Sequence, residues 1–479
     1  MIRAIGTLCT RVFQAICPDP FVIAILLTLV TVVAALLWGQ PPERAAAGPI
    51  FDAWRDPGGG YWKLLAFAMQ MCLILVTGHA LASAPVVDRA IQQWAGVPKT
   101  ASGAAGLVAA VACLAALINW GLGLIVGALF ARAVGEAMAR KGVAVHYPLL
   151  AAAGYLGLMV WHGGLSGSAP LSVTSLASAR GSLPESALAL LPAGGIPLGQ
   201  TLFSPLNLAV TGGLVLLAPI LAVLVAPTDP RAIRPISDFP VRGDSAHEPA
   251  GPDDSGRTTL PDRLNHSVVV ALLLAIPLVA AVGRFVWLRG GVDAPLALRL
   301  STGMQSIGLN EINMVMLAVG LIAHGSPVRY MAAAEGAARG CAGIMIQFPL
   351  YAGIMGIMVE SGLAARLADL FSRVDAPQAI PVLSFVAAAL LNLFIPSGGG
   401  QWAVQGPIAL AAGHSGGIEP GTMVMAVAYG DQLTNMLQPF WALPLLAITG
   451  VRARDIVGYT ATIMLFASLW IAACLWFLG

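Results

Sequence analysis

Long apolar stretches recur along most of the chain, and they constrain its fold more than any other feature. One crossing of a bilayer core takes about 20 mainly apolar residues, and only helices or closed barrels satisfy their backbone groups in hydrocarbon. The sequence therefore predicts an all-α polytopic membrane protein. Nine stretches have spanning length: Pro20–Gly39, Tyr61–Ala84, Tyr147–Leu165, Pro205–Ala226, Ser267–Leu288, Ile307–His324, Gly340–Ser361, Gly421–Ile448 and Ile456–Leu478.

Two further apolar segments are too long for one crossing and too short for two. Gly103–Val134 and Ala379–Gly413 each have somewhat over 30 residues. Each is interrupted near its centre, by NWGLG at Asn119–Gly123 and by PSGGG at Pro396–Gly400. Because two crossings need about 40 residues and a turn, we expect each segment to form a re-entrant hairpin that turns inside the membrane.

The composition excludes several other classes of protein. Hydrophobic residues make up 58% of the chain and charged residues 10%, whereas soluble domains carry about 25% charged residues. A net charge of +2 provides no basic surface for nucleic acid. The six cysteines form no CxxC pair and no cluster with histidine, so we expect neither a metal site nor a disulfide framework. No cofactor is expected beyond a coupling ion.

The distribution of charge predicts the orientation. Arg3 and Arg11 precede the first apolar stretch, which is longer than the core of a signal peptide, so we expect a retained first helix. Residues 227–265 contain 5 Arg and 7 acidic residues and read as a polar loop. With a cytoplasmic N-terminus this loop and most basic connections fall inside, as the positive-inside rule requires.

The two halves of the chain resemble each other. We expect inverted repeats at 1–226 and 300–479, joined by a transmembrane helix at 266–290, because the first copy begins inside and the second outside. Inverted repeats with paired broken helices are typical of secondary transporters that bind substrate near the midplane. Three residue pairs share a nearly constant offset: Gln70 and Gln347 (347−70=277), Asn119 and Asn392 (392−119=273), and Tyr155 and Tyr429 (429−155=274).

The glycine-rich cluster of the second hairpin is a candidate anion site. A helix that restarts at Ser397–Gly400 exposes N–H groups at its positive end, and glycines let a carboxylate approach them closely. The first hairpin offers Asn119, Gly121 and Gly123 in the corresponding place. Close helix packing by glycine is the alternative interpretation.

A second broken stretch follows each hairpin. Residues 162–170 run HGGLSGSAP, and residues 431–435 run DQLTN ahead of a proline at 439. Their hydroxyls and amides are suited to a carboxylate or a partly dehydrated cation. Asp431 stands out because a carboxylate inside an apolar run usually faces a cavity or a partner. For His162, a structural role and a ligand-contacting role both remain open.

Aromatic residues flank these polar clusters and would hold a short alkyl chain; positions in an interfacial belt are the alternative. The aromatic residues are Trp120, Trp402, Phe440 and Trp441. The expected substrate site comprises Asn119, Trp120, Gly163, Gly164, Ser166, Ser397, Gly398, Gly399, Gly400, Trp402, Thr434 and Asn435. The expected cation-coupling groups are Asn119, Asn392, Ser397 and Asp431. Sodium bound by oxygens and a proton bound on Asp431 both remain open.

Long blocks of this sequence resemble the AtoE-type short-chain fatty acid transporter family of the ion transporter superfamily. They are CPDPFVIAILLTL at Cys17–Leu29, LLAFAMQMCLILVTGHALAS at Leu64–Ser83, INWGLGLIVGALFAR at Ile118–Arg132, IPSGGGQWAVQGP at Ile395–Pro407 and AYGDQLTNMLQPFWALP at Ala428–Pro444. The resemblance implies uptake of acetoacetate- or butyrate-like monocarboxylates across a bacterial inner membrane. With nine crossings and a cytoplasmic N-terminus, we expect the C-terminus in the periplasm. The resemblance also implies a homodimer in which a scaffold domain holds a moving transport domain, as in elevator-type, cation-coupled symport. The sequence departs from the family pattern twice, with Asp431 where the family has glutamate and His162 where it has glycine.

Two other functions are the alternatives. A cation/proton antiporter could use a related scaffold. An intramembrane serine protease could use Ser166, since Gly164–Gly167 matches the GxSG pattern, and His162 or His79 would then be the base that activates the serine. No Walker A sequence occurs, so ATP-driven transport is not supported.

Overall fold

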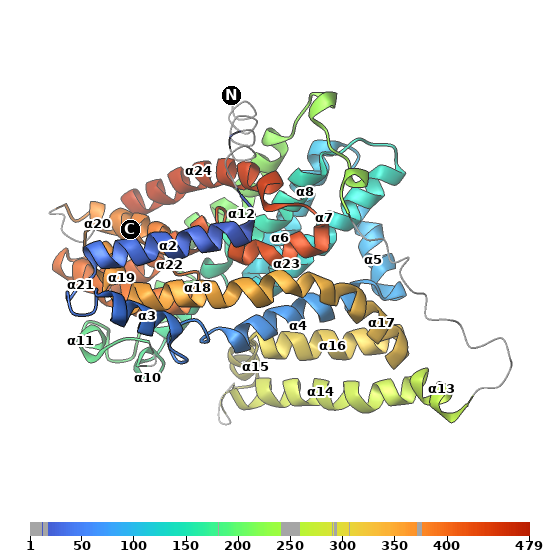
Figure 1. Ribbon diagram of the computed structural model, residues 1–479, viewed down its shortest axis with the longest axis horizontal. Coiled ribbons are helices and arrows are strands. Elements are labelled where there is room, and N and C mark those ends of the chain that lie inside the picture. Colours follow the sequence, from blue (N-terminus) through green and yellow to red (C-terminus); the bar gives the residue numbers. More distant parts are fainter. Residues whose placement is uncertain are drawn as a thin grey trace.

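The computed structural model describes residues 12, 18–180, 182–240, 259–289, 291, 295–305, 307–370 and 376–479. These residues form helices and connecting segments without any strand (Figure 1). Nine helical spans in the described part of the chain are long and apolar enough to cross a membrane, and one of them is the broken segment Tyr147–Ser172. The protein is therefore an all-α, multi-pass membrane protein, as predicted.

The first half contains eleven α-helices and three short 3₁₀ segments among the described residues. They are α2 (Pro20–Trp38), α3 (Ala47–Arg55), α4 (Leu65–Ala82), α5 (Pro85–Ala95), α6 (Ala101–Ile118), α7 (Trp120–Arg140), α8 (Tyr147–Tyr155), η1 (Leu156–Met159), η2 (Trp161–Gly163), α9 (Ser168–Ser172), α10 (Leu176–Ala179), α11 (Glu185–Leu188), η3 (Leu198–Gln200) and α12 (Pro205–Val225).

The described remainder of the chain begins with short elements of the polar loop and ends with the longest helix. The elements are η4 (Pro230–Ala232), η5 (Ile236–Asp238), α13 (Leu260–Asn265), α14 (Val268–Arg289), α15 (Leu296–Gln305), α16 (Leu309–His324), α17 (Pro327–Ala338), η6 (Arg339–Cys341), α18 (Ala342–Glu360), α19 (Leu363–Leu370), α20 (Ala379–Asn392), α21 (Gly398–Ser415), α22 (Pro420–Thr434), α23 (Pro439–Thr449) and α24 (Ala453–Leu478).

Local capping explains where several of these helices begin. The Asp19 carboxylate accepts the Phe21 N–H ahead of α2, and Pro20 occupies the first helical position. The Ser204 hydroxyl accepts the Asn207 N–H at the start of α12. Each side chain satisfies an N–H group that has no partner within its helix. These helices start at the predicted residue for that reason.

Both predicted hairpin segments are broken at the predicted clusters. α6 ends at Ile118 and α7 begins at Trp120, while α20 ends at Asn392 and α21 begins at Gly398. The arms of the first hairpin are longer than predicted, with 18 and 21 residues, which is about 27 and 32 Å of helix. Each of these arms therefore has the length of a bilayer core, and the re-entrant turn inside the membrane stays a prediction.

The order of elements is similar in the two halves. A long helix (α4 or α18) is followed by a short amphipathic helix (α5 or α19), a hairpin (α6–α7 or α20–α21), a broken helix, and a final long helix (α12 or α24). The first broken helix runs from α8 through η2 to α9, and the second from α22 to α23. The inverted relation between the halves and the domain limits drawn from the sequence stay predictions.

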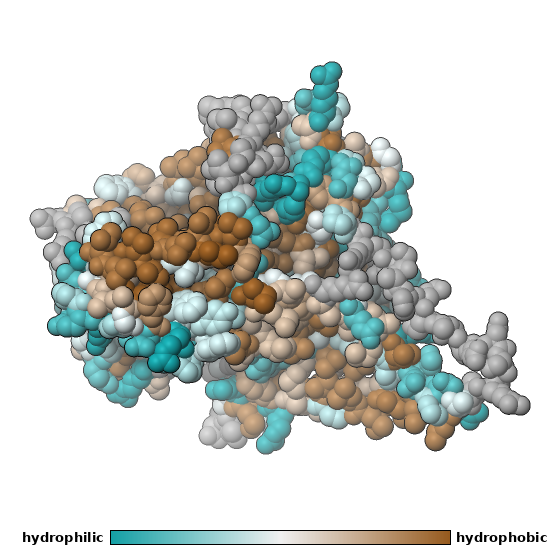
Figure 2. Space-filling model, in the orientation of Figure 1, coloured by the Kyte–Doolittle hydropathy of each residue, from teal (hydrophilic) through white to brown (hydrophobic). Residues whose placement is uncertain are grey.

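Packing divides the helices into interior and peripheral ones. α6 packs against α7, α8 and α12, α7 also packs against α8, and α22 packs against α20 and α21. α2 and α14 lie outside, because only 17% of the residues in the most apolar 18-residue stretch of each helix are buried. α2 forms a continuous apolar surface in Figure 2, with Leu29, Leu37 and Trp38 among its exposed side chains. These two helices present the surface that lipid would cover.

The described start of the polar loop is attached to two helix ends; residues 241–258 of the predicted loop lie outside the described part. The Arg234 guanidinium lies 2.7 Å from the Asp455 carboxylate at the start of α24. The Arg234 N–H donates to His146 Nδ1, directly before α8, at 3.1 Å. Burial, followed by the charge of Arg234, lowers the pKa of His146 to about 4, so this residue is neutral and accepts a hydrogen bond at neutral pH.

Candidate functional site

The two broken helices brace each other. At the first break, the N–H groups of His162 and Gly163 donate to Gln432 Oε1 of α22, at 3.0 and 3.3 Å. At the second break, the Tyr155 hydroxyl of α8 donates to the carbonyl oxygens of Asn435 and Gln438, at 2.9 and 3.1 Å. Each broken helix thus supplies the side chain that the other needs, and we call the two together the broken-helix pair.

Further side chains complete this bracing. Backbone groups exposed by a helix break need partners inside the protein, since hydrocarbon offers none. The Asn207 amide of α12 donates to the Gly163 carbonyl at 2.9 Å, and the Tyr429 hydroxyl donates to Asn207 Oδ1 at 3.0 Å. The Gln438 amide donates to the Asn392 carbonyl at the end of α20, at 2.7 Å. These contacts hold the broken segments in one arrangement.

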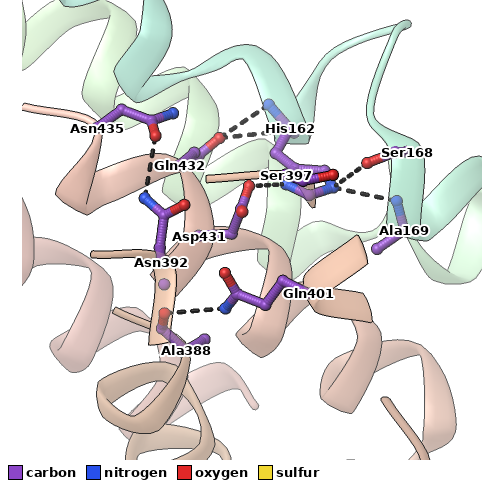
Figure 3. Close-up of polar contacts among 12 residues, drawn as sticks. His162, Ser168, Ala169, Ala388, Asn392, Ser397, Gln401, Asp431, Gln432 and Asn435 are labelled. Atoms are coloured by element: carbon purple, nitrogen blue, oxygen red, sulfur yellow. Dashed lines mark hydrogen bonds and ion pairs between the residues drawn. The ribbon is translucent and has the colours of Figure 1, made fainter. Parts of the chain in front are cut away.

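His162 and Asp431 form a buried pair at the centre of the broken-helix pair (Figure 3). His162 Nδ1 lies 2.7 Å from Asp431 Oδ2. The side chains are 1% and 3% exposed, so water screens the contact very little. On the other edge of the ring, His162 Nε2 lies 3.1 Å from the Ser168 hydroxyl and 3.0 Å from the Ala169 nitrogen. The sequence singled out both members of the pair without predicting that they bond.

The contacts of His162 define its protonation state. A backbone N–H can only donate, so the bond from Ala169 requires His162 Nε2 to be an acceptor without a proton. The ring proton therefore lies on Nδ1 and is donated to the Asp431 carboxylate. In this arrangement His162 is neutral, and with Asp431 ionised the pair carries one negative charge.

The tip of the second hairpin presents free backbone donors. The Ser397 hydroxyl caps α21 by accepting the Gly400 N–H at 3.2 Å, whereas the N–H groups of Gly398 and Gly399 make no hydrogen bond within the described part of the chain. A Cβ at Gly398 would lie 2.6 Å from Ser168 Oγ and 2.9 Å from His162 Cε1, while one at Gly399 would meet no atom within 4 Å. The tip therefore packs against His162 on one side and faces open space on the other.

The tip of the first hairpin differs, because its donors already have partners. Asn119 Oδ1 accepts the N–H groups of Gly121 and Leu122, at 2.9 and 3.3 Å. The Ser166 hydroxyl accepts the Trp120 N–H at 3.0 Å. Ser166 thus contacts a backbone nitrogen, and in the described structure it is Ser168 that bonds to His162, so the arrangement expected for a Ser166 protease is not observed.

An aromatic cluster lies beside the first tip. Trp120 is 5.0 Å from Trp441, 6.2 Å from Phe67 and 6.3 Å from Trp161, measured between ring centroids. Trp402 lies elsewhere, fully buried in a different group of apolar residues. Gly406, one turn later in α21, packs against the Trp402 indole. The structure therefore brings Trp120 and Trp441 together and leaves Trp402 apart from them.

Asn392, Thr434 and Asn435 form a polar brace between α20 and the second break. The Asn392 amide nitrogen donates to Thr434 Oγ1 at 3.1 Å and to Asn435 Oδ1 at 3.0 Å. Its own Oδ1 is buried and has no partner among the described residues, as is also the case for Gln401 Oε1 of α21. Gln401 and Gln405 were missed from the sequence, although polar residues four apart in an apolar helix arm indicate a buried polar face.

The comparisons with known proteins cover nearly the whole chain. Residues 1–478 match the family model described as short chain fatty acid transporter. The chain belongs to the short-chain fatty acid transporter family. This transporter is 39% identical over 476 residues to a protein of Escherichia coli (strain K12), and 35% identical over 478 residues to one of Haemophilus influenzae (strain ATCC 51907 / DSM 11121 / KW20 / Rd). Both relatives are named provisionally as short-chain fatty acid transporters, and each match covers 98% of both chains.

Solved structures are more distant from this transporter. The YdaH transporter of Alcanivorax borkumensis matches with a TM-score of 0.43 at 16% identity, over 95% of this chain and 98% of the other. MtrF of Neisseria gonorrhoeae matches with a TM-score of 0.36 at 14% identity, over 98% of both chains. Similarities at this level support no conclusion about mechanism.

Proposed function

We propose that the protein is a secondary active transporter that carries short-chain fatty acids, acetoacetate- or butyrate-like monocarboxylates, across the bacterial inner membrane. The observation that carries the proposal is the tip of the second hairpin. The N–H groups of Gly398 and Gly399 at the start of α21 have no partner in the described structure, and open space adjoins Gly399. Two free donors at the positive end of an 18-residue helix suit a carboxylate.

The aromatic cluster supports the remainder of the substrate. Trp120 contacts Ser166 through its backbone and Trp161 through its ring, and Trp161 stacks on His162 at 4.2 Å. Apolar rings therefore continue from the polar centre toward α7 and α23. A chain of two to a few carbons, held at its carboxylate by Gly398 and Gly399, would lie against this apolar surface.

Coupling to a cation is part of the proposal. With Asp431 ionised, the His162–Asp431 pair carries one negative charge in a buried position, and a second negative charge on the substrate would add to it. A co-transported cation reduces the charge that has to cross the hydrocarbon region. We assign symport on this basis, with movement of a transport domain against a scaffold in a homodimer, as expected for the family.

Counterflow into proteoliposomes tests the transport function. Vesicles loaded with unlabelled butyrate should take up radiolabelled butyrate faster than protein-free vesicles, and unlabelled acids of two to six carbons should compete according to their length. Sodium and pH are varied independently in the same assay. A cation/proton antiporter on this scaffold would move cations and no labelled butyrate, which would reject the proposed function.

A further inference from the structure

His162 lies where three parts of the site meet. Its Nδ1 edge bonds to Asp431 on α22, and its Nε2 edge faces Ser168 and Ala169 at the start of α9. The tip of the second hairpin packs on the same ring, since a Cβ at Gly398 would come within 2.9 Å of His162 Cε1. Figure 3 shows Asp431 on one side of the ring and Ser168 and Ala169 on the other.

When His162 is neutral, its Nε2 accepts a hydrogen bond and thereby occupies donor groups near the tip of the second hairpin. His162 Nε2 has one lone pair and accepts the Ala169 N–H at 3.0 Å, with the Ser168 hydroxyl 3.1 Å away. Ser168 Oγ in turn lies 2.6 Å from the Cβ position of Gly398. Two potential donors to a substrate are therefore directed at the histidine when the histidine is neutral.

A proton added to Nε2 would reverse this arrangement. Nε2 would then donate, and Ser168 Oγ would be its nearest acceptor, which leaves the Ser168 O–H free to donate to another group. The Ala169 N–H would lose its partner and also become free. The imidazolium charge would be stabilised by the Asp431 carboxylate at 2.7 Å and would lie beside the tip. The free Ser168 hydroxyl and one positive charge would then lie beside Gly398, next to the two free N–H groups of the tip.

We propose that His162 binds the coupling proton at Nε2, and that its protonation completes the carboxylate site at Gly398 and Gly399. This inference rests on the proposed transport function and assigns its coupling ion to a residue. Proton and carboxylate strengthen each other's binding, because each carries the charge that the other lacks. Reciprocal coupling of this kind between two ligands is what symport requires.

The charge balance agrees with one proton for each carboxylate. The unprotonated pair has a charge of −1, and the protonated pair is neutral. With a bound carboxylate and a proton the site returns to −1, so the loaded and empty states carry the same charge, and one cycle moves no net charge. A carboxylate bound without the proton would give −2 in a region of low dielectric, which is the costly state.

No other charged group of the described structure replaces His162 in this balance. Of the elements packed on η2 and α22, the described parts of α6, α9, α20 and η1 carry no Asp, Glu, Lys or Arg. The remaining groups lie mainly toward helix ends or have partners of their own. On α7, Arg132 and Glu136 lie 2.9 Å apart, and Arg140 bonds to Gln92. At the start of α24, Arg454 is followed by Asp455, which is paired with Arg234 and Arg452. The others are His414 in the last turn of α21, Tyr429 of α22, which bonds to Asn207, Tyr459 and Cys474 of α24, and Cys113 of α6.

Proton uptake on binding tests the inference in the wild-type protein. Butyrate binding is measured by calorimetry in detergent, in buffers of different ionisation enthalpy, at several pH values between about 6 and 8. We expect binding to take up protons, approaching one per butyrate, with no requirement for sodium. Butyrate binding without proton uptake across this range, or uptake that occurs unchanged in His162→Gln, would overturn the inference and leave the transport function intact.

Accumulation in proteoliposomes gives the second test. With an inward proton gradient the wild type should take up labelled butyrate at a higher initial rate than protein-free vesicles, whereas His162→Gln should show reduced counterflow that no longer varies with pH and no gradient-driven uptake beyond that of protein-free vesicles. His324→Gln is the matched control, because that partly buried histidine bonds the Ala80 carbonyl outside this site and should behave as wild type.

The outcomes separate the two proposals. Accumulation by His162→Gln that is still driven by the proton gradient rejects His162 as the proton site, as does wild-type accumulation that follows only a sodium gradient. In the sodium case Asn392 Oδ1 and Gln401 Oε1, which have no partner in the described part of the chain, would become the candidate ligands. Absence of counterflow in the wild type itself would reject the transport function on which the inference rests.

Discussion

Replacement of Gly399 by valine tests the anion site most directly. Gly399 is exposed, and a Cβ there meets no atom within 4 Å. The backbone is helical and has no positive φ, so valine fits without strain. The helix propensity of valine is slightly better than that of glycine, so the free energy of unfolding should not fall. The new side chain would occupy the space that a carboxylate needs next to the two N–H groups.

The magnitude follows from the hydrogen bonds that would be lost. Each bond from an N–H group to a charged carboxylate contributes about 1.5 to 3 kcal/mol. Loss of both bonds at Gly398 and Gly399 would cost at least about 3 kcal/mol, which is roughly a 150-fold weaker apparent affinity for butyrate. Gly399→Ala, with a single methyl group in the same space, should give an intermediate loss.

The assay is concentration-dependent counterflow of labelled butyrate, with the amount of folded protein measured by size-exclusion chromatography. Gly212→Val is the matched control, because Gly212 is also an exposed helical glycine with no atom within 4 Å of a Cβ, on α12. The control should keep the wild-type half-saturation concentration. A Gly399→Val protein with wild-type half-saturation would refute the placement of the carboxylate at this tip.

Three further predictions follow from the described contacts. Tyr155→Phe removes the hydroxyl that bonds the carbonyls of Asn435 and Gln438, and it should lower the free energy of unfolding by about 1 to 3 kcal/mol, measured as a lower Tm in detergent. Asp431→Asn removes the charge that would stabilise protonated His162, so gradient-driven accumulation should be lost while some counterflow remains; unchanged accumulation would remove Asp431 from coupling. The lowered pKa of His146, about 4, means that the folded state resists a proton which the unfolded state accepts near pH 6.5. Tm should therefore fall as the pH drops from about 6.5 toward 4, and this fall should be smaller in His146→Gln.

Much of the fold was predictable because hydrocarbon imposes strict rules on sequence. Apolar runs predicted the ends of α2, α12 and α14 to within one residue of the observed ends, and the helix breaks at Asn119 and Pro396 followed from their glycine and polar clusters. Membership of the short-chain fatty acid transporter family was likewise evident from long sequence blocks.

The site was predictable only in part. Sequence singled out His162, Asp431 and the Gly398–Gly400 tip, because polar or glycine clusters inside apolar runs are conspicuous. It could not indicate that His162 bonds to Asp431, since residues 269 positions apart come together only through the fold. Nor could the sequence distinguish the two tips. Asn119 accepts two N–H groups at the start of its helix, whereas Ser397 accepts one and leaves those of Gly398 and Gly399 without a partner in the described structure. Both residues are polar helix caps before glycines, so the sequence does not show this difference.

The reciprocal bracing of the broken-helix pair has a consequence for biosynthesis. The N–H groups of His162 and Gly163 are satisfied by Gln432, a residue synthesised about 270 positions later. Each unpaired polar group in hydrocarbon costs several kcal/mol. We therefore expect that the first broken segment adopts its final position inside the membrane only after the second half has been translated and inserted. We expect the first half, expressed alone, to be degraded, and to be rescued when the second half is co-expressed as a separate chain.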